Sequence, residues 1–554
     1  MRRHQAEDFS KIDEAQSGFR PGYSTVDNLY CLMTTVQKYL SKKGGRFYFL
    51  FVDFSKAFDS ISHEKLIKCL IRKGVGGKFL KLLISMYNDL CSCVKTSENT
   101  CTDYFDCNIG TRQGCKLSPI LFSLFIDELV ETLRREGAVG IQILNDSDSL
   151  IALLYADDVA NLADTVRNLQ FQLDILSRFC ELSDMKINLS KTKIMVFRNG
   201  GYIRENEKWY FQGQKLEVVS VYKYMGLMIT PKLIWTTATN GLATQANKSI
   251  ISMLKMQHSV GYFDYDEYFK LFDTMIKPIL CYASEIWGYQ YSNAVERVHD
   301  QFCRKFLKLP SNTANIFVRG ECGRWPLYID YFCKCIKYWI RLMRMDTYRY
   351  PYQCYKMLRN LDEVGRITWA TKVKELLYLH GFGYVWFYEN VGDEKIFIKT
   401  FRQRLIDSSI QDWSSKLNES GKARHYRYIM PNFGLATYLK YNLPLKFRIP
   451  LSKLRCSVHN LLVETGRHKN IDYENRICVL CNSANIEDEF HFVMICPFYE
   501  DLRISFLSNM SHLHFTLEKF YDLFNGERGL VLGLSKYIYY AFERRNNFMK
   551  NMIE

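Results

Sequence analysis

The sequence contains no long apolar run. No uninterrupted hydrophobic stretch approaches the roughly 20 residues that a membrane-spanning helix needs. The N-terminal stretch MRRHQAEDFSKIDEAQSGFRPGY also lacks the apolar segment of a secretory signal peptide. No internal repeat and no low-complexity linker interrupts the chain. These absences predict an intracellular protein, located in the cytoplasm and nucleus, that has no membrane partner.

The composition is that of a globular chain with enough apolar material for several cores. Of its 554 residues, 47% are hydrophobic and 24% are charged. The usual domain size then suggests about three to four domains. The 18 cysteines are scattered along the chain. Because no signal peptide accompanies them, they indicate reduced thiols, with room for a metal site, rather than a disulfide framework.

Positive charge is concentrated in one segment. The net charge of the chain is +15, and residues 415–470 carry six Lys and five Arg against two Glu, a local net of +9. Aromatic residues are interleaved with these charges: Tyr426, Tyr428, Phe433, Tyr438, Tyr441 and Phe447. Such a segment suits a phosphate backbone with bases to stack on, but it also suits a solvated basic face whose aromatics belong to a core. Charge alone leaves both interpretations open.

The first part of the chain mixes strand and helix patterns. GRFYFLFVDF, residues 45–54, is a continuous aromatic and aliphatic run typical of a strand buried on both faces. Ser62 can cap a helix that stops near Gly74. Ser118, followed by Pro119, can cap a second helix. Strands mixed with helices and hairpins predict an α+β fold rather than a doubly wound parallel sheet.

Two adjacent aspartates lie at the tip of a predicted hairpin. In SLIALLYADDVANLA, Asp157 and Asp158 separate two short apolar arms, and Asp tolerates turn geometry. Asp53 ends the predicted strand. If strand and hairpin are neighbours in one sheet, the three carboxylates meet at one edge, where Mg²⁺ ions can compensate their charge. By itself, an Asp-Asp turn is more often a solvated loop.

Several segments follow one another in a fixed order: QSGFRPGYSTVDNL, FVDFSKAFDSI, GTRQGCKLSPILFSLFIDEL, LLYADDVANL, KINLSKTKIMVF and YKYMGLMI. They resemble the successive blocks of reverse transcriptases, most of all those of non-LTR (LINE-type) retrotransposons. The order and spacing match over about residues 16–230, and weaker similarity continues to about residue 340. The resemblance implies a right-hand polymerase palm, followed by helical thumb-like and C-terminal regions.

The resemblance also implies roles for individual residues. Asp53 and Asp157 would hold two Mg²⁺ ions, and Asp158 would complete the catalytic triad. Phe58 would lie beneath the sugar of the incoming nucleotide and exclude a 2′-hydroxyl; a core aromatic is its structural alternative. Further contacts are implied with the nucleotide and template for Phe54, Gln113, Gly114 and Lys191, and with the primer for Met225 and Gly226. An ordinary loop and a surface lysine are the alternatives for the RQG segment and the lysine.

A cysteine and histidine cluster follows the basic segment. Cys478, Cys481, His491 and Cys496 have the spacing C-x2-C-x9-H-x4-C, which can fill all four positions of a structural Zn²⁺ site. A chance C-x2-C with a core histidine is the alternative. The cluster resembles the C-terminal zinc knuckle of LINE-type proteins, which favours RNA or DNA contact for the basic segment upstream. Because acidic residues 487–489 lie inside the knuckle, phosphate contact is expected from flanking Arg and Lys.

These patterns divide the chain into predicted regions. They are partial fingers at 1–45, the palm at 46–230, a helical thumb-like or connection region at 231–345, a helical basic nucleic-acid-binding region at 346–470, the zinc knuckle at 471–505 and a helical tail at 506–554. The endonuclease domain and early finger motifs with which the family's proteins usually begin are not recognised. We therefore expect an N-terminally truncated chain.

The resemblance implies a specific activity, RNA-directed DNA synthesis. The chain would be a nucleotidyltransferase that uses dNTPs, an RNA template and a DNA primer or target. The alternative is a catalytically inactive, transposon-derived nucleic-acid-binding protein, because the missing fingers would have carried the cationic grip on the triphosphate. A palm used on DNA templates is also open, and the sequence does not reveal the oligomeric state.

Overall fold

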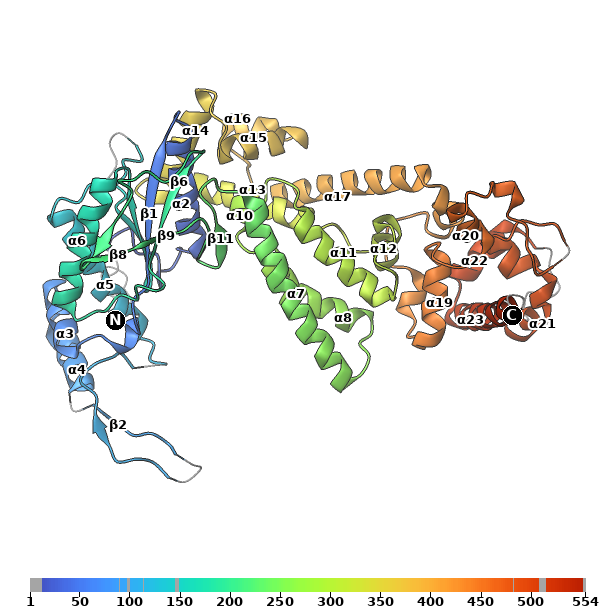
Figure 1. Ribbon diagram of the computed structural model, residues 1–554, viewed down its shortest axis with the longest axis horizontal. Helices are drawn as coiled ribbons and strands as arrows, with labels where there is room; N and C mark the ends of the chain where they lie inside the picture. Colours follow the sequence, from blue (N-terminus) through green and yellow to red (C-terminus); the bar gives the residue numbers. More distant parts are fainter. Residues whose placement is uncertain are drawn as a thin grey trace. The chain divides into compact units, whose positions relative to one another are not determined.

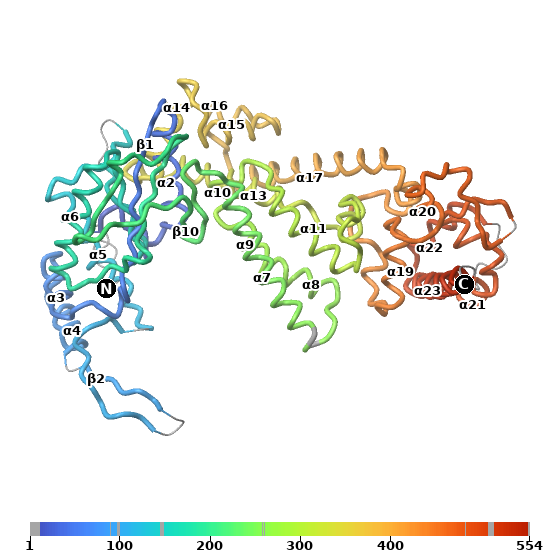
Figure 2. Tube along the Cα trace, in the orientation of Figure 1, coloured from blue at the N-terminus to red at the C-terminus, as the bar shows by residue number. Residues whose placement is uncertain are grey.

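The computed structural model describes residues 12–551, apart from positions 89, 97–99, 113, 145–148, 482 and 508–514. The chain forms two compact units. The first comprises Met1–Gly241, Ala283–Gln290 and Lys334–Glu394, and the second comprises Leu242–Tyr282, Tyr291–Cys333 and Lys395–Glu554. Figure 1 labels the helices and strands, and Figure 2 traces the chain through them. The predicted regional boundaries after residue 230 stay predictions.

The first unit contains all the described strands. They are β1 (Arg46–Val52), β2 (Cys91–Ser92), β3 (Phe105–Asp106), β4 (Ala152–Tyr155), β5 (Asp158–Ala163), β6 (Lys193–Arg198), β7 (Tyr210–Phe211), β8 (Gln214–Lys215), β9 (Glu217–Val218), β10 (Tyr222–Tyr224) and β11 (Leu227–Ile229). Its helices are α2 (Thr25–Leu40), η2 (Ala57–Asp59), α3 (His63–Arg72), α4 (Gly77–Tyr87), α5 (Ser118–Arg135), α6 (Val166–Ser183), α10 (Ser284–Trp287), α14 (Tyr350–Glu363), α15 (Trp369–Leu379) and α16 (Gly383–Tyr388).

The described part of the second unit is helical. Its elements are α8 (Tyr265–Leu271), η3 (Phe272–Ile276), α9 (Lys277–Leu280), α11 (Asn293–Leu307), α12 (Asn315–Cys322), η4 (Gly421–Ala423), α18 (Tyr426–Ile429), η5 (Thr437–Lys440), α19 (Leu445–Arg455), α20 (Leu462–His468), η6 (Tyr473–Asn475), η7 (His491–Ile495), η8 (Pro497–Tyr499), α21 (Glu500–Phe506), α22 (Leu517–Asn525) and α23 (Arg528–Asn551). Three helices run from one unit into the other: α7 (Trp235–Val260), α13 (Tyr328–Met343) and α17 (Glu394–Glu419).

A five-stranded sheet forms the core of the first unit. Its strand order is β4-β5-β1-β6-β9, and all neighbours are antiparallel except β6 and β9. The central strand β1 is buried over all but its first residue, as its continuous apolar run predicts. A strand buried on both faces needs cover on both sides. Helix α2 contacts β1, β4 and β6, whereas α6 contacts β1 and β5, and Figure 1 shows these helices on opposite sides of β1.

Helix boundaries follow the predicted signals with one exception. Ser62 caps α3 by accepting a hydrogen bond from the Lys65 backbone N–H at 3.5 Å. Gly74, with φ of 79°, follows the end of α3 in the left-handed conformation that suits glycine. Ser118 is the first residue of α5 rather than its cap, so that prediction is wrong. Its hydroxyl donates to the Arg112 carbonyl at 2.7 Å and thereby fixes the preceding loop instead.

A late part of the chain returns to the first unit and packs on α2. Helices α14 and α2 are in contact, and Figure 2 shows the yellow α14 beside the blue α2. Asp27, buried in the first turn of α2, accepts hydrogen bonds from the Tyr338 hydroxyl (2.9 Å) and from Arg341 Nη2 (3.0 Å). The ring of Trp369 meets Tyr30 of α2 edge-on at 5.0 Å. These contacts join residues more than 300 positions apart in the sequence.

A buried ion pair joins two helices of the second unit. Arg455 of α19 donates from Nε to both carboxylate oxygens of Glu321 in α12, at 3.0 and 2.9 Å. Neither side chain is exposed to solvent. Because separating a buried pair leaves an uncompensated charge, this contact holds α19 in one position against α12.

Two further findings concern the whole described chain. None of the described helices combines the length and the apolar character needed to cross a bilayer. All 18 cysteines belong to the described residues, and each is a free thiol. The mixed sheet and helices of the first unit confirm the predicted α+β class.

Candidate active site and metal centre

Strand pairing brings Asp53 and the Asp157–Asp158 pair to one edge of the sheet. Asp53 directly follows β1, and Asp158 is the first residue of β5. The two strands are antiparallel neighbours with Val52 opposite Val159. The end of one strand therefore meets the start of the other. The adjacency of strand and hairpin on which the predicted cluster depends is present.

The N-terminal segment holds the hairpin turn in place. Ala156 and Asp157 join β4 to β5, and Ala156 has φ of 57°. Gln16 Oε1 accepts hydrogen bonds from the backbone N–H groups of Ala156 (3.2 Å) and Gly18 (2.7 Å). A Cβ atom on Gly18 would lie 2.3 Å from the Ala156 nitrogen, so this close approach requires glycine. Sequence patterns did not reveal the part played by Gln16, because a glutamine has no distinctive spacing signal.

The carboxylates influence one another and a neighbouring tyrosine. Partial burial, together with the charges of Asp157 and Asp53, raises the pKa of Asp158 to about 6. Burial and the charges of Asp158 and Asp53 raise the pKa of Tyr222 to about 12. The Tyr222 ring stacks on Phe51 of β1 at 4.2 Å, which places β10 beside the carboxylate edge. This concentration of negative charge is the kind that divalent cations compensate.

A loop after α6 packs against Asp53. The Asp53 backbone N–H donates to Thr192 Oγ1 at 3.1 Å, and its carbonyl accepts from the Asn188 N–H at 2.8 Å. Lys191 Nζ lies 3.7 Å from Asp53 Oδ2, with 66% of the lysine side chain exposed. An exposed ion pair of this length is weak. The ammonium group is therefore able to reach an anion bound beside the carboxylates.

An aromatic stack fixes the position of Phe58. Its ring is stacked on Phe122 of α5 with centroids 4.2 Å apart, and it meets Phe19 edge-on at 6.4 Å. Phe58 is half-buried, so part of its ring is accessible to a ligand. Phe54 is buried, with 5% of its surface exposed, and offers a ligand its backbone at most.

The remaining predicted nucleotide and primer residues belong to loops and turns. Gly114 has φ of 81°, and a Cβ atom there would meet nothing within 4 Å, so its conformation rather than crowding favours glycine. Gln113 lies outside the described residues. Met225, with φ of 46°, and Gly226, with φ of 82°, form the two-residue turn between β10 and β11. This turn belongs to the hairpin that carries Tyr222.

Comparison with known proteins assigns this arrangement to a family. Residues 2–229 match the family described as Reverse transcriptase (RNA-dependent DNA polymerase). They form a reverse transcriptase domain. The domain contains the sheet, the hairpin and all three carboxylates described above.

The reverse transcriptase domain has relatives in R2 retrotransposable elements. The retrovirus-related Pol polyprotein of element R2DM from Drosophila melanogaster is 33% identical over 32% of this chain and 16% of that protein. R2 Pol polyproteins are 26% identical over 32% of this chain in Popillia japonica, and 23% identical over 60% in Bradysia coprophila. The alignments span only 26% and 37% of those two proteins. These relatives confirm the resemblance to non-LTR reverse transcriptases.

Outside the reverse transcriptase domain, the second unit brings the four predicted zinc ligands together. The ligand atoms of Cys478, Cys481, His491 and Cys496 all lie within 4.8 Å of one another. The Cys478 N–H donates to the Asn485 carbonyl at 2.8 Å, which closes a short hairpin around the first two cysteines. Of the other two ligands, His491 is the first residue of the π-helical turn η7 and Cys496 directly follows that turn. A hairpin and a helical turn thus converge on one point.

The donor atoms of this cluster are those of a soft-ligand metal site. Cys481 Sγ lies 3.4 Å from His491 Nε2. The hydrogen bond from Cys496, supported by contacts with the other cluster members, holds the pKa of Cys478 below its usual range. A thiolate is the form of cysteine that binds metal. Three sulfur atoms and one imidazole nitrogen fit the tetrahedral coordination of zinc.

The acidic residues inside the metal loop are engaged rather than solvated. Glu487 is buried and accepts hydrogen bonds from Arg545 Nε (2.9 Å) and Nη2 (2.8 Å). Glu489 Oε1 lies 2.9 Å from His459 Nε2. Asp488 Oδ1 accepts the backbone N–H of the histidine ligand at 2.8 Å. The sequence did not reveal Arg545 and His459 as partners of the glutamates, because they lie 58 and 30 positions away along the chain. Together these contacts fix the metal loop to its surroundings.

Proposed function

We propose that the chain acts as the RNA-directed DNA polymerase of a non-LTR retrotransposon. In this reaction, a primer 3′-hydroxyl attacks a dNTP that is paired with an RNA template. The observation that carries the proposal is the convergence of Asp53, Asp157 and Asp158 at one edge of the sheet in a reverse transcriptase domain. The partners are an RNA template, a DNA primer or target, and dNTPs.

Asp53 and Asp157 are the proposed ligands of two Mg²⁺ ions, and Asp158 completes the catalytic triad. When bound, these ions supply activation of the attacking oxygen and stabilisation of the leaving pyrophosphate. The pKa of Asp158, raised first by burial and then by the charges of Asp157 and Asp53, supports the assignment, because a bound cation stabilises the ionised carboxylate. Carboxylates are also the oxygen ligands that Mg²⁺ prefers.

The nucleotide is positioned by groups around the carboxylates. Phe58 presents part of its ring and is held by its stack on Phe122, which supports a role in excluding the 2′-hydroxyl of a ribonucleotide. Lys191, close to Asp53 and exposed, is the proposed cation for the departing pyrophosphate. Gly114 lets its backbone approach the nucleotide, and Gln113 and the Phe54 backbone are the further proposed contacts.

The primer end is assigned to the β10–β11 hairpin. Its turn residues Met225 and Gly226 follow β10. The pKa of Tyr222 in β10 is raised by burial and by the charges of Asp158 and Asp53. In this proposal, the turn would hold the primer end so that its terminal hydroxyl reaches the metal ligands. The contact would position the attacking atom rather than take part in the chemistry.

In the second unit, the Cys478, Cys481, His491 and Cys496 cluster is the proposed Zn²⁺ site of a knuckle. All four positions are filled by protein, so its role is structural. We assign the thumb-like region to residues 231–345 and the nucleic-acid-binding region to 346–470, as the sequence predicts. The positive charge of residues 415–470 supports the second assignment.

Primer extension tests the proposed activity. The full chain is incubated with a primed RNA template, dNTPs and Mg²⁺, alongside Asp157→Asn and the matched control Asp174→Asn. Asp174 is an exposed carboxylate of α6 that bonds Gln170 rather than a catalytic residue. We expect extension by the native chain and the control, and loss of at least about a thousandfold in Asp157→Asn, because one metal would lose its ligand. Extension that persists in Asp157→Asn would overturn the proposal.

A further inference from the structure

A basic pocket lies in the second unit beside the metal loop. Its volume is about 480 Å³. The residues that define it here lie in or directly after η4, α20 and η6: Lys422, Arg424, Arg467, Tyr473 and Arg476. The reverse transcriptase domain does not contain this pocket, and neither the catalytic proposal nor the zinc proposal uses these side chains.

The pocket carries more positive charge than its own carboxylates neutralise. Glu464 accepts from Arg467 Nη2 at 2.5 Å and lies 3.7 Å from Lys422 Nζ. The other lining carboxylate, Glu489, is engaged by His459 at 2.9 Å. Among the described residues, Arg424 and Arg476 have no carboxylate partner. Two guanidinium charges are therefore left for an external anion.

Tyr473 adds an aromatic face to these charges. The Arg424 guanidinium lies over its ring, with the central carbon 3.6 Å from the ring centroid, and the Arg476 guanidinium carbon lies 5.9 Å away. Arg424 is exposed, and Tyr473 is half-buried. A planar cation resting on a ring presents both a charge to a phosphate and a flat surface to a base. Arginine and tyrosine together are the groups that proteins use to hold unpaired nucleotides.

Arg476 is held in the pocket by its backbone surroundings. Its Nε donates to the Ile471 carbonyl (2.9 Å) and its Nη1 to the Val463 carbonyl (2.8 Å). Its side chain lies across Gly466, where an added Cβ atom would be 3.0 Å from Arg476 Cγ and 3.1 Å from Cδ. Glycine at this position makes room for the arginine. The cation is thus fixed in place before any ligand arrives, which lowers the entropic cost of binding.

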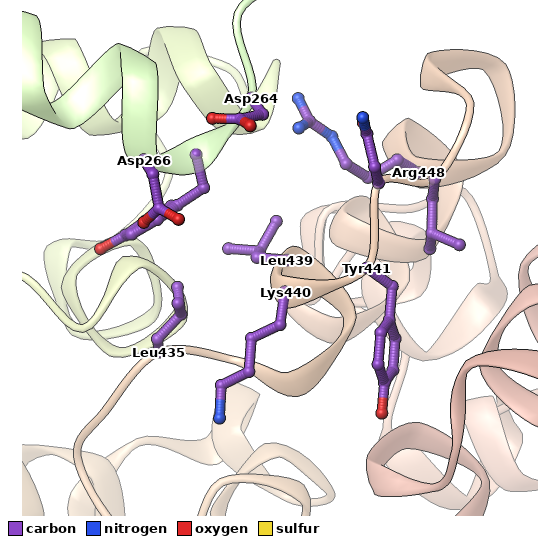
Figure 3. Close-up of a pocket in the computed structure, with 10 residues that line it drawn as sticks. Asp264, Asp266, Leu435, Leu439, Lys440, Tyr441 and Arg448 are labelled. Carbon is purple, nitrogen blue, oxygen red and sulfur yellow. The ribbon is translucent and has the colours of Figure 1, made fainter.

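A second cavity of the same unit provides a comparison, because its basic residues are matched in number by acidic residues. That cavity, about 160 Å³ in volume, is lined by Lys440 and Arg448 on one side and by Asp264 and Asp266 on the other. Figure 3 shows these four charged side chains around the cavity. Its opposite charges balance in number, so it has no net attraction for an anion. The basic pocket differs by its uncompensated arginines and its aromatic ring.

We propose that the basic pocket binds one phosphodiester group and the adjacent unpaired base of a single-stranded nucleic acid. Arg424 and Arg476 contact the phosphate, and the base stacks on the Arg424–Tyr473 pair. This inference rests on the proposed function, in which the chain handles an RNA template and a DNA primer. RNA and DNA share the phosphodiester chemistry, and the strand that occupies the pocket is identified by the experiment below.

Fluorescence anisotropy on the full chain tests the pocket. Labelled single-stranded RNA and DNA of the same sequence are titrated over a range of salt concentrations. Tyr473→Ala is expected to weaken binding about tenfold through lost stacking, whereas Tyr473→Phe keeps the ring and binds within about twofold of the native chain. Arg424→Ala is expected to reduce the salt dependence by about one unit of slope. Gly466→Ala displaces the Arg476 side chain without removing charge and is expected to weaken binding as well.

Arg404→Ala is the matched control, because Arg404 is an exposed arginine of α17 outside the pocket. It is expected to change affinity by less than about twofold at physiological salt. If the pocket variants bind both RNA and DNA more weakly, the shared phosphodiester site is supported. If they bind only one of the two more weakly, the site is supported and that nucleic acid is identified as its ligand. If Tyr473→Ala and Arg424→Ala bind both strands like the control, the pocket proposal is overturned.

Primer extension with the same preparations separates this failure from failure of the proposed function. Extension that depends on Asp157 while the pocket variants bind normally would refute the pocket alone. Pocket-dependent binding without any extension would refute the polymerase proposal and leave the pocket supported. Thermal melting of each variant shows whether the second unit is folded, and Tyr473→Phe provides the folded reference.

Discussion

Glu487 and Arg545 form a two-point ion pair that is almost completely buried, with 2% and 5% of their side chains exposed. Glu487 also accepts the Leu462 backbone N–H at 2.8 Å, so one carboxylate ties α23, α20 and the metal loop together. The Glu487 carboxylate thus connects residue 462 to residue 545, which lie far apart in the sequence. It is the contact in the metal loop that local sequence patterns were least able to reveal.

Arg545→Ala should destabilise the second unit strongly. Removing the arginine leaves the Glu487 carboxylate buried without its partner, which costs about 3–5 kcal/mol in the free energy of unfolding. The neighbouring Arg544→Ala is the matched control, because Arg544 pairs with the exposed Asp501 and should cost about 0–1 kcal/mol. Urea denaturation of the full chain measures both values. Equal losses in the two variants would show that the buried pair does not stabilise the unit.

Stabilisation by a divalent cation should depend on pH through Asp158. Its pKa of about 6 lies above the ordinary value, so the ionised carboxylate opposes folding, and the stability that it contributes at low pH is lost as the pH rises toward and through 6. A bound cation stabilises the ionised Asp158 carboxylate against burial and against the charges of Asp157 and Asp53. It also competes with the proton below pH 6. We expect Mn²⁺ to raise the melting temperature of the protein more at about pH 7.5 than at about pH 5.

Asp158→Asn removes the titrating group and should flatten this pH dependence. Differential scanning fluorimetry with and without Mn²⁺ measures the shift for both proteins. A cation-induced shift that is the same at both pH values in the native chain would contradict the assignment of Asp158 to the metal cluster.

Phe58→Val should relax the choice between deoxyribonucleotides and ribonucleotides. The smaller side chain opens space for a 2′-hydroxyl, and relief of an overlap of this size is worth about 10- to 200-fold in discrimination. Incorporation of dNTPs should remain close to the native rate. Single-nucleotide extension with dNTP and rNTP pairs measures the ratio, and Phe122→Leu serves to separate loss of the stacking partner from loss of the ring itself. A ratio that does not change in Phe58→Val would remove the steric role.

Zinc should be present at one ion per chain and should depend on the cluster. Cys478→Ser combined with Cys481→Ser is expected to abolish the metal and lower the melting temperature, because binding free energy is folding free energy at such sites. Cys107→Ser is the control, since Cys107 is a half-exposed thiol outside the cluster. Elemental analysis of the purified full chain gives the stoichiometry. Retention of zinc in the double variant would exclude these ligands.

Local signals were sufficient for the elements that build the carboxylate edge. The run from Phe47 to Val52 is apolar throughout, which is typical of a strand buried on both faces, and Asp53 directly follows that strand at the edge of the sheet. The turn before Asp158 was indicated by polar residues between apolar arms. The Ser118 cap failed because a hydroxyl can bond to a nearby loop carbonyl as readily as to the helix, and that choice depends on how the loop folds.

Long-range partners could not be predicted from these patterns. Asp27 accepts the backbone N–H of Ser24, as an ordinary first-turn acid does, yet it also accepts hydrogen bonds from the distant Tyr338 and Arg341. The acidic run at 487–489 looks solvated, yet Glu487 is paired with Arg545 and Glu489 is in hydrogen-bond contact with His459. In each case, burial of the polar side chain costs free energy unless a distant group forms a hydrogen bond with it. The periodicity of the sequence does not indicate which group that is.

The return of residues 334–394 to α2 has a consequence for the order in which the protein matures on the ribosome. The contacts of Asp27 and Tyr30 come from segments made more than 300 residues later, which at about 5–20 residues per second means a delay of tens of seconds. During that interval, the side of α2 that later contacts Tyr338 and Trp369 is exposed on the nascent chain. A chaperone that covers this side during translation would therefore raise the yield of folded protein.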